Sequence, residues 1–463
     1  MNSGASSKAE HWDVGPVAIL IAGLMFMESL DASVIPTAAP TIARAFHVTS
    51  SQMGICMTAY LATVLVLIPV SAWLVEKWGV RPVLFSAIVL FTTASVLCAV
   101  STSLPELTLM RVLQGAGGAM MVPVGRFIVL RSTDKANIIR AISYLTWPAL
   151  FAPVIAPALS GYLITYASWP WIFLINMPLG IVALVIAFRI IPAGDHGNAG
   201  KLDWVGFYGT VLSLGALVIG AAELGKPHAS SIVTFILLVV AVGAGVPTVR
   251  HMLRVQSPLV GLGALSIRTF RSASAGGGLF RIAVNAVPFL LPLLFQDKFG
   301  WSPARTGTIV LFLFLGNVGF KPLTTPILKR FRFRSVLIIS GIISALSIVA
   351  LVAMRSTTSV VVIAGVLIVS GSFRSLGYTC YNTITFADIE QPMMREANSL
   401  ANMIQQLTNV FAVVCAVISM KVGASLLGSS QQFSFAFWVV IAFMLLAVVG
   451  AVRLPRTAGD SIR

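Results

Sequence analysis

Charged side chains are scarce in this sequence. They make up 10% of its 463 residues, whereas hydrophobic side chains make up 57%. Soluble globular domains carry about a quarter of charged residues, so the composition excludes that class. Apolar runs of about 20 residues, the length that a helix needs to cross the hydrocarbon core, recur along the whole chain. The sequence therefore predicts an all-α integral membrane protein without a separate soluble domain.

Acidic residues are scarcer than basic ones, with 15 Asp and Glu against 31 Lys and Arg and a net charge of +16. A basic excess can indicate nucleic-acid binding, but that function needs a basic face on a soluble surface. We therefore expect no nucleic-acid partner.

The four cysteines lie inside apolar runs, which predicts neither a disulfide framework nor a metal site. They are Cys56, Cys98, Cys380 and Cys415.

Signatures of nucleotide binding and of enzymes are also missing. The segment "GAAELGKP" (220–227) resembles a phosphate-binding loop, but Pro227 replaces the required Ser or Thr and no strand precedes it. No nucleophile–base pair or metal constellation is apparent, and the histidines all fall in terminal or loop segments. We therefore expect no enzymatic activity and no cofactor, with an ion gradient as the energy source. The histidines are His11, His47, His196, His228 and His251.

The apolar runs predict fourteen membrane spans. With both termini in the cytoplasm, most Lys and Arg residues outside the spans fall on the inner side, as the positive-inside rule requires. This orientation accounts for the basic excess. The predicted spans are 14–42, 51–74, 82–101, 105–127, 139–165, 171–190, 204–223, 231–249, 273–296, 305–328, 335–354, 358–384, 396–424 and 433–453.

An internal repeat indicates how the spans are grouped. The inner loop "VEKWGVRPVL" at 75–84 is echoed by "LKRFRFRSVL" at 328–337. The distance along the chain between these two loops is larger than the length of a six-helix unit. Two additional helices are therefore expected between parallel halves. We predict a six-helix bundle over 1–192, two inserted helices with their connectors over 193–257, and a second six-helix bundle over 258–463.

Four short motifs in the sequence together match the pattern of a known family. "LDASVIPTAAPTIA" (30–43) places an acid, Asp31, before Pro36 and Pro40. "AWLVEKWGVRP" (72–82) follows the loop pattern G-x-L-A-D-R-x-G-R-K, with Ala72 in place of the first glycine and Glu76 in place of the aspartate.

The other two motifs lie in the helices at 105–127 and 139–165. The pattern R-x-x-Q-G-x-G-G-A is met in full by "RVLQGAGGA", which starts at Arg111. The pattern G-x-x-x-G-P-x-x-G-G is matched more loosely by "APVIAPALSG" (152–161), which keeps Pro157 and Gly161. With these motifs the chain resembles the major facilitator superfamily, and within it the fourteen-helix drug:proton antiporters. The resemblance covers the whole chain and implies two six-helix bundles, plus two inserted helices, that work by alternating access.

Two acids stand inside the first apolar run, in "FMESLDAS" (26–33). A charge at membrane depth costs at least about 2.5–3.5 kcal/mol, so such an acid faces a cavity or a partner. Glu28 and Asp31 lie three residues apart on one helical face, and Arg111 lies level with Asp31 on an antiparallel helix. The resemblance implies that Asp31, Glu28 and Arg111 couple proton movement to transport. A permanent ion pair that only fixes two helices is the alternative.

Gating is expected at two places. The loop residues Glu76, Lys77, Gly79 and Arg81 are predicted to latch the inner side. Glu76 is expected near the positive helix start at 397–399, or near Arg126 and Arg131 at the inner end of the helix at 105–127. The alternative is a basic surface anchor. Pro153 and Pro157 bend the helix at 139–165, which in the family seals one side of the cavity. The alternative is a kinked packing helix.

The second half carries cations inside its spans, whereas its acids lie at helix ends or in loops. Arg281, Lys321 and Arg374 indicate either an anionic substrate or side chains that reach the inner surface. The full set of expected substrate-binding residues comprises Glu28, Tyr60, Gln114, Trp147, Arg281, Asn285, Lys321, Arg374 and Tyr378.

The function expected is proton-coupled export of amphipathic small molecules, without a cofactor. Export of organic anions or carboxylate metabolites, and a non-transporting membrane sensor or scaffold, are the alternatives. The expected partners are a small-molecule substrate, protons and membrane lipids, in a monomer. The expected location is a bacterial inner membrane.

Overall fold

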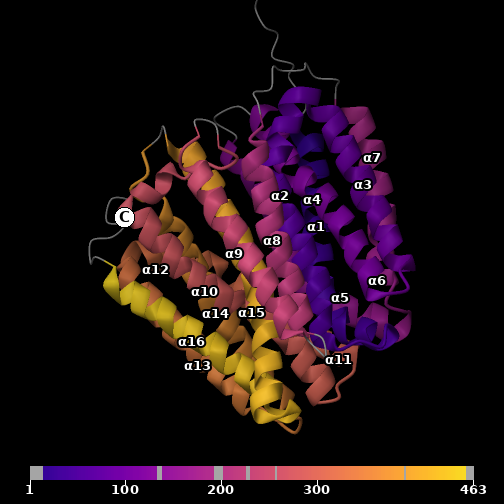
Figure 1. Cartoon of the computed structure of the whole chain (residues 1–463), viewed down its shortest axis with the longest axis vertical. Helices are drawn as coiled ribbons and strands as arrows, with labels where there is room; N and C mark the ends of the chain where they lie inside the picture. The colour runs from indigo at the N-terminus through magenta and orange to yellow at the C-terminus, as the bar shows by residue number, and fades with distance from the viewer. Residues whose placement is uncertain are drawn as a thin grey trace, which may run out of the picture.

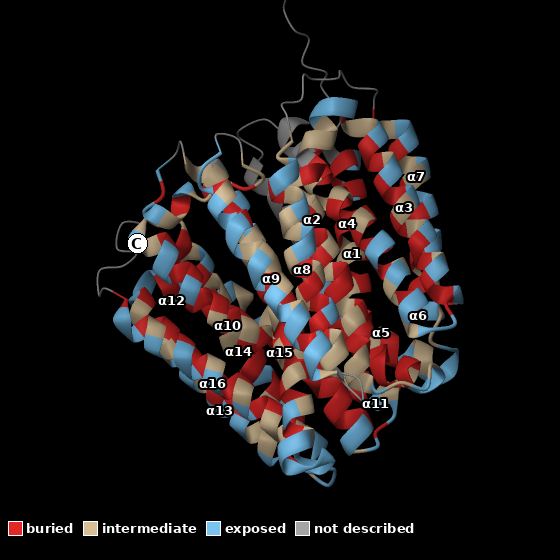
Figure 2. Ribbon diagram, in the orientation of Figure 1, coloured by how far each residue is buried: buried red, intermediate tan, exposed pale blue. Residues whose placement is uncertain are grey.

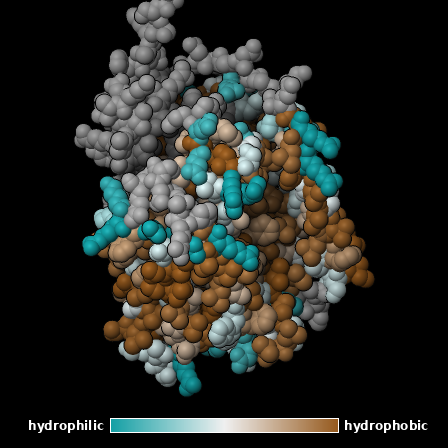
Figure 3. All heavy atoms as spheres, turned by 90° about the vertical axis from the view of Figure 1, so that its left-hand side faces the viewer, coloured by the Kyte–Doolittle hydropathy of each residue, from teal (hydrophilic) through white to brown (hydrophobic). Residues whose placement is uncertain are grey.

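The structure is a computed structural model of the chain, and it describes residues 14–132, 138–191, 202–225, 230–255, 258–390 and 393–454. These residues form helices, and the described part contains no β-strand (Figure 1). The predicted all-α fold is confirmed. Hydrophobic side chains cover the middle of the face in Figure 3, while hydrophilic ones gather above and below it. This banding is what a membrane-spanning bundle requires.

The N-terminal half begins with the helix that carries both acids. Helix α1 packs against α5, α4 and α7, while α2 and α3 both pack against α4. Helices α6 and α7 are two pieces of one span, Trp171–Ile190. The bounds are α1 (Val14–Ala45), α2 (Gly54–Trp78), α3 (Val80–Val100), α4 (Leu104–Ser132), α5 (Ile138–Tyr166), α6 (Trp171–Leu174) and α7 (Asn176–Ile190).

Two helices follow before the second half begins, α8 (Trp204–Gly225) and α9 (Ser231–Met252). They pack on each other, and α8 also touches α2 and α15, so this pair lies across the seam between the halves (Figure 1). One flank of α9 is exposed, with Ile232, Phe235 and Val242 at 73%, 68% and 64% (Figure 2). In a membrane these side chains face lipid.

The C-terminal half contains a broken span. Helices α11 and α12 meet at an angle of 43°, next to Pro322, which cannot donate a backbone hydrogen bond. Lys321 opens α12 at this bend. The bounds are α10 (Arg268–Leu293), α11 (Pro303–Gly319), α12 (Lys321–Arg330), α13 (Phe333–Ala353), α14 (Val360–Thr385), α15 (Met394–Leu427) and α16 (Gln432–Arg453).

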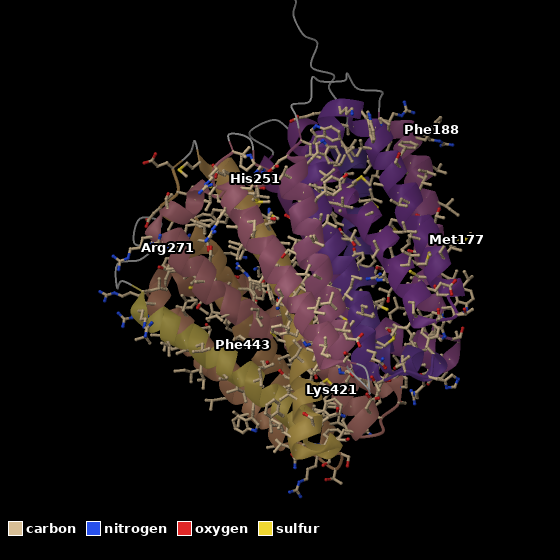
Figure 4. All side chains as sticks on the ribbon, viewed as in Figure 1. Met177, Phe188, His251, Arg271, Lys421 and Phe443 are labelled. Atoms are coloured by element: carbon tan, nitrogen blue, oxygen red, sulfur yellow. The ribbon has the colours of Figure 1, made fainter. Side chains whose placement is uncertain are left out.

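Each predicted span coincides with a helix or a helix pair. Twelve helices in the described residues are long and apolar enough to cross a membrane, and the bent pair α11–α12 makes a thirteenth if it is counted as one. The remaining expected span, 139–165, coincides with α5, of which Leu150–Tyr166 is apolar but shorter. Figure 4 shows Arg271 at the left-hand edge of the molecule and Lys421 in its lower part.

Candidate functional site

An ion pair lies inside the N-terminal half, between α1 and α4. Arg111 Nη1 donates to Asp31 Oδ2 at 2.5 Å. Both residues are only 1% exposed. Burial strengthens such a charge-assisted bond, and removing one partner would leave a buried charge uncompensated. The ion pair predicted from the helix directions is present.

Amide side chains complete the surroundings of Asp31. Gln114 Nε2 and Asn176 Nδ2 each donate to Asp31 Oδ1 at 2.8 Å. Both amides also donate to Ser95 Oγ, at 2.6 and 3.3 Å respectively. Gln114 Oε1 in turn accepts from Arg111 Nη1 at 2.6 Å. Gln114 was expected to contact substrate, but it is fully buried and its amide is engaged by the ion pair.

Glu28 lies in a different environment, although it is only three residues from Asp31. Tyr60 Oη donates to Glu28 Oε1 at 3.5 Å, and the Tyr60 ring lies 4.1 Å from the guanidinium carbon of Arg111. Glu28 is partly exposed, whereas Asp31 is sealed. Tyr60 therefore stands between an accessible acid and a buried ion pair.

The glycines of α4 allow this close arrangement. A Cβ added at Gly118 would lie 2.9 Å from Tyr60 Oη and 3.3 Å from Glu28 Oε1. A Cβ at Gly115 would lie 2.8 Å from the Tyr60 carbonyl oxygen, which real side chains do not tolerate. Small residues let membrane helices approach closely. The motif "RVLQGAGGA" therefore supplies both the ion-pair partner and the space beside Glu28.

The predicted inner loop connects α2 with α3. Glu76 and Lys77 are exposed, and Lys77 Nζ lies 4.6 Å from the Trp73 ring centroid. Gly79 has φ of +85°, a conformation that favours glycine. Arg81 donates to the Phe188 carbonyl at 3.3 Å. Arg81 thus ties α3 to α7. Arg126 and Arg131 are the other expected partners of Glu76, and their side chains lie outside those that the structure describes.

The proline-containing helix α5 contacts the opposite half directly. Pro148, Pro153 and Pro157 lie within α5, and a Cβ at Gly307 of α11 would overlap the Pro157 carbonyl. One turn further, a Cβ at Gly161 would overlap the Pro303 carbonyl. The two helices therefore touch backbone to backbone at the end where α5 ends and α11 begins (Figure 1).

Buried apolar residues follow the same division. The largest cluster joins the second part of α1, including Val34 and Ala38, to Phe289 and Leu293 of α10. Toward the other end, the described buried residues form separate clusters, one around Ile21 in the N-terminal half and one around Phe270 in the C-terminal half. The largest core shared by the halves therefore lies toward one end of the molecule, and two smaller clusters join α2 to α15 beside α8.

The cations of the C-terminal half have neutral partners. Arg374 donates to Val284 O and to Asn285 Oδ1, both at 3.1 Å. Lys321 Nζ donates to Thr379 Oγ1 at 2.9 Å. Tyr378 Oη donates to Asn285 Oδ1 at 2.9 Å. The structure thus brings together the residues expected on α10 and α14, while the Trp147 side chain lies outside those described.

Two participants in the buried pair were missed in the sequence. Ser95 stands in an apolar helix, and Asn176 opens α7 within the span after "SWPWIFLI". A single amide in an apolar run was the available signal for Asn176. Its contact with Asp31 joins residues 145 positions apart, a separation that no helical spacing predicts.

Comparison with known proteins decides the family. The model of the Major Facilitator Superfamily matches residues 21–413. The chain belongs to the major facilitator superfamily. It is therefore related to transporters, and it is a multi-pass membrane protein.

Curated relatives match over most of their length. "Probable transport protein HsrA" of Haemophilus influenzae is 31% identical over 96% of this chain and 97% of that protein. "Putative multidrug resistance protein MdtD" of Pectobacterium carotovorum is 32% identical over 100% of this chain and 98% of that protein. The Escherichia coli O6:H1 protein of the same name is 36% identical over 86% and 84%. The resemblance drawn from the four motifs is confirmed.

Solved structures show the same fold at low identity. A D-xylose-proton symporter has a TM-score of 0.69 at 14% identity, covering 96% of this chain and 98% of that one. A bacterial homologue of the lysosomal transporter Spinster, inward-facing and occupied, has a TM-score of 0.65 at 13% identity, covering 94% and 95%. Such identities support the fold and nothing finer.

Proposed function

We propose that this major facilitator protein is a proton-coupled exporter of amphipathic small molecules. The observation that carries the proposal is the arrangement of the two acids, one partly exposed beside Tyr60 and one locked to Arg111. The names of the MdtD relatives, which refer to multidrug resistance, support export of drug-like substrates. No cofactor is needed for this chemistry.

Glu28 is the group we assign to carry the proton. A proton carrier must reach the transport cavity, and Glu28 keeps part of its surface exposed while Asp31 does not. A bound cation, or a change in solvation, alters the free energy of the charged carboxylate and so its proton affinity. Asp31 and Arg111 hold α1 and α4 in place around it.

The way the halves meet supports a cycle of alternating access. With both termini in the cytoplasm of a bacterial inner membrane, the α5–α11 contact lies at the outer end. The shared core then closes the outer side, and the separate clusters at the inner end correspond to an inward-facing state. Outward opening requires α5 and α11 to separate while the inner ends approach.

The energy available suffices for export. A membrane potential of 100 mV contributes about 2.3 kcal/mol per elementary charge. Because about 1.4 kcal/mol corresponds to a factor of ten, one proton supports a gradient of roughly 50-fold for a neutral substrate. A monomer is sufficient for this cycle.

Export of organic anions is the second candidate. It is favoured by Arg281, Lys321 and Arg374, whose recorded hydrogen-bond acceptors within the described residues are all uncharged. An anionic substrate group would compensate their charge.

The test is pH-gradient-driven transport in proteoliposomes with a cationic dye, a neutral drug and a small carboxylate. The proposal predicts accumulation of the dye or the neutral drug, abolished by a protonophore. Accumulation of the carboxylate alone would favour the second candidate. Fluxes that match protein-free liposomes for all three compounds, under every gradient, would contradict transport and favour a sensor or scaffold.

A further inference from the structure

A polar cavity of about 200 Å³ lies within the C-terminal half, apart from the acid pair of the N-terminal half. It lies between α10, α14, α15 and the turn after α14, and it is partly open, since Asn382, Asn398 and Asn402 are exposed residues. Its polar lining consists of one guanidinium, four side-chain amides and two hydroxyl groups, and it contains no carboxylate. The guanidinium belongs to Arg281, the amides to Asn382, Asn398, Asn402 and Gln405, and the hydroxyls to Ser274 and Thr385.

Arg281 supplies the charge of this cavity. It is 4% exposed, and its Nη2 donates to Asn382 Oδ1 at 2.6 Å. Its Nε has no hydrogen-bond partner among the described residues. A guanidinium offers five donors in a planar fork that matches two oxygens at once. An anion that enters the cavity would compensate the charge of this buried cation and lower its free energy.

Two acids of this half, Asp388 and Glu396, bind groups outside the cavity. Asp388 accepts a hydrogen bond from Thr269 at 2.7 Å, and Glu396 accepts one from the Gly263 N–H at 2.6 Å. Both lie toward helix ends and neither lines the cavity. The charge of Arg281 is therefore left for a ligand to neutralise.

The amides of α15 are arranged on one side. Asn398, Asn402 and Gln405 follow the spacing of four and three residues that places side chains on one helical face. Each amide can donate two hydrogen bonds. Together with Arg281 they place hydrogen-bond donors from two helices, α10 and α15, around one cavity.

The size of the cavity limits what it takes. At about 30 Å³ per water molecule, it holds roughly seven waters. Pockets for complete drug-sized ligands measure about 300–1,000 Å³. The cavity thus suits a charged head group with a few attached atoms, while the rest of the molecule lies outside it.

We propose that this cavity is an anion-binding subsite that takes a carboxylate or phosphate group through Arg281 and the α15 amides. The inference rests on the proposed transport function in its second form, export of organic anions, in which the anionic group belongs to the exported molecule. An anionic lipid head group is the other source of the same chemistry. Binding here would not involve Glu28, which lies in the opposite half.

Equilibrium binding of radiolabelled benzoate to the full chain, in nanodiscs of phosphatidylcholine, tests the proposal without requiring transport. We expect saturable binding that Arg281→Gln weakens by about 10-fold or more, since a charge-assisted pair is lost. Arg281→Lys should recover part of the affinity. Lys329→Gln, which removes an exposed cation of the same half, is the matched control and should bind as wild type does.

A second variant covers the case in which Arg281→Gln does not fold. Asn402→Leu keeps the charge and should weaken benzoate binding severalfold. The neutral isostere benzamide should not compete. Replacing part of the phosphatidylcholine with the anionic lipid phosphatidylglycerol shows whether the natural anion is a lipid head group. If phosphatidylglycerol displaces benzoate from the wild type and this displacement depends on Arg281, the cavity binds a lipid head group through the same anion chemistry.

Two results would overturn the inference. One is benzoate binding that is equal in wild type, Arg281→Gln and Asn402→Leu. The other is the absence of benzoate binding in phosphatidylcholine, together with phosphatidylglycerol stabilising wild type and Arg281→Gln equally or not at all. Failure of proton-driven transport with Arg281-dependent binding intact would instead contradict the proposed function alone.

Discussion

At the scale of single residues, two acids three positions apart have opposite environments. Asp31 receives donors from Arg111, Gln114 and Asn176, whereas Glu28 meets the Tyr60 hydroxyl and remains partly exposed. The same α-helix carries both, so the difference arises from the neighbouring helices. We therefore assign stability to the first acid and proton exchange to the second.

Asp31→Asn should destabilise the protein by about 3–5 kcal/mol, because it leaves Arg111 buried without a counter-charge. Thermal unfolding in detergent measures this as a lower midpoint. Arg111→Gln should cost a similar amount, and the double variant should be less destabilised than the two single effects combined. Strict additivity would show that the pair is not coupled.

At the scale of helices, glycines and prolines determine where elements meet. Gly307 and Gly161 allow α5 and α11 to touch through their backbones, and Pro322 accompanies the bend between α11 and α12. The inserted pair is fastened differently. Asp203, just before α8, accepts hydrogen bonds from the N–H groups of Gly206 and Leu259 and pairs with His251 of α9.

Gly307→Leu should open the outer end, because a larger side chain cannot fit against the Pro157 carbonyl. Overpacking costs about 1–3 kcal/mol, which shifts the balance of two states by about 5- to 150-fold. Thiol labelling of a cysteine placed near the α5–α11 contact measures this as faster reaction from outside. Gly365→Leu is the control, because nothing lies within 4 Å of its added Cβ. Equal labelling in both variants would refute the contact as a gate.

Asp203→Asn should lower the thermal midpoint at neutral pH. Burial raises the pKa of Asp203, but hydrogen bonds from Gly206, His251 and Leu259 outweigh it and hold that pKa below its usual range. A lowered pKa means that the stabilisation is present at neutral pH and lost as the pH falls through the folded value. The difference between wild type and variant should therefore shrink in acid. A difference that stays constant with pH would contradict this role.

At the scale of the whole molecule, sequence patterns predicted the helices better than their contacts. The spans follow from the lengths of apolar runs, and the Asp31–Arg111 pair follows from depth on antiparallel helices. The part played by Asn176, and the burial of Gln114 away from any substrate, depend on how α4 and α7 pack around α1. The break at Lys321 was missed because the apolar run continues through it, although Pro322 marked the position.

The division between the end at which the largest core joins the halves and the end with separate clusters is also a whole-molecule property. It arises from contacts between α1 and α10 and between α5 and α11, which join residues more than a hundred positions apart. No local pattern specifies such a state.

The most direct test of the account measures two activities of Glu28→Gln in the same proteoliposomes. These are substrate exchange at equal pH on both sides and accumulation driven by a pH gradient. We predict that exchange persists while accumulation falls by about 10-fold or more, because the proton-exchanging group is gone. Glu106→Gln, which alters an exposed acid at the start of α4, should accumulate substrate as wild type does. Undiminished gradient-driven accumulation by Glu28→Gln would contradict the claim that Glu28 carries the proton.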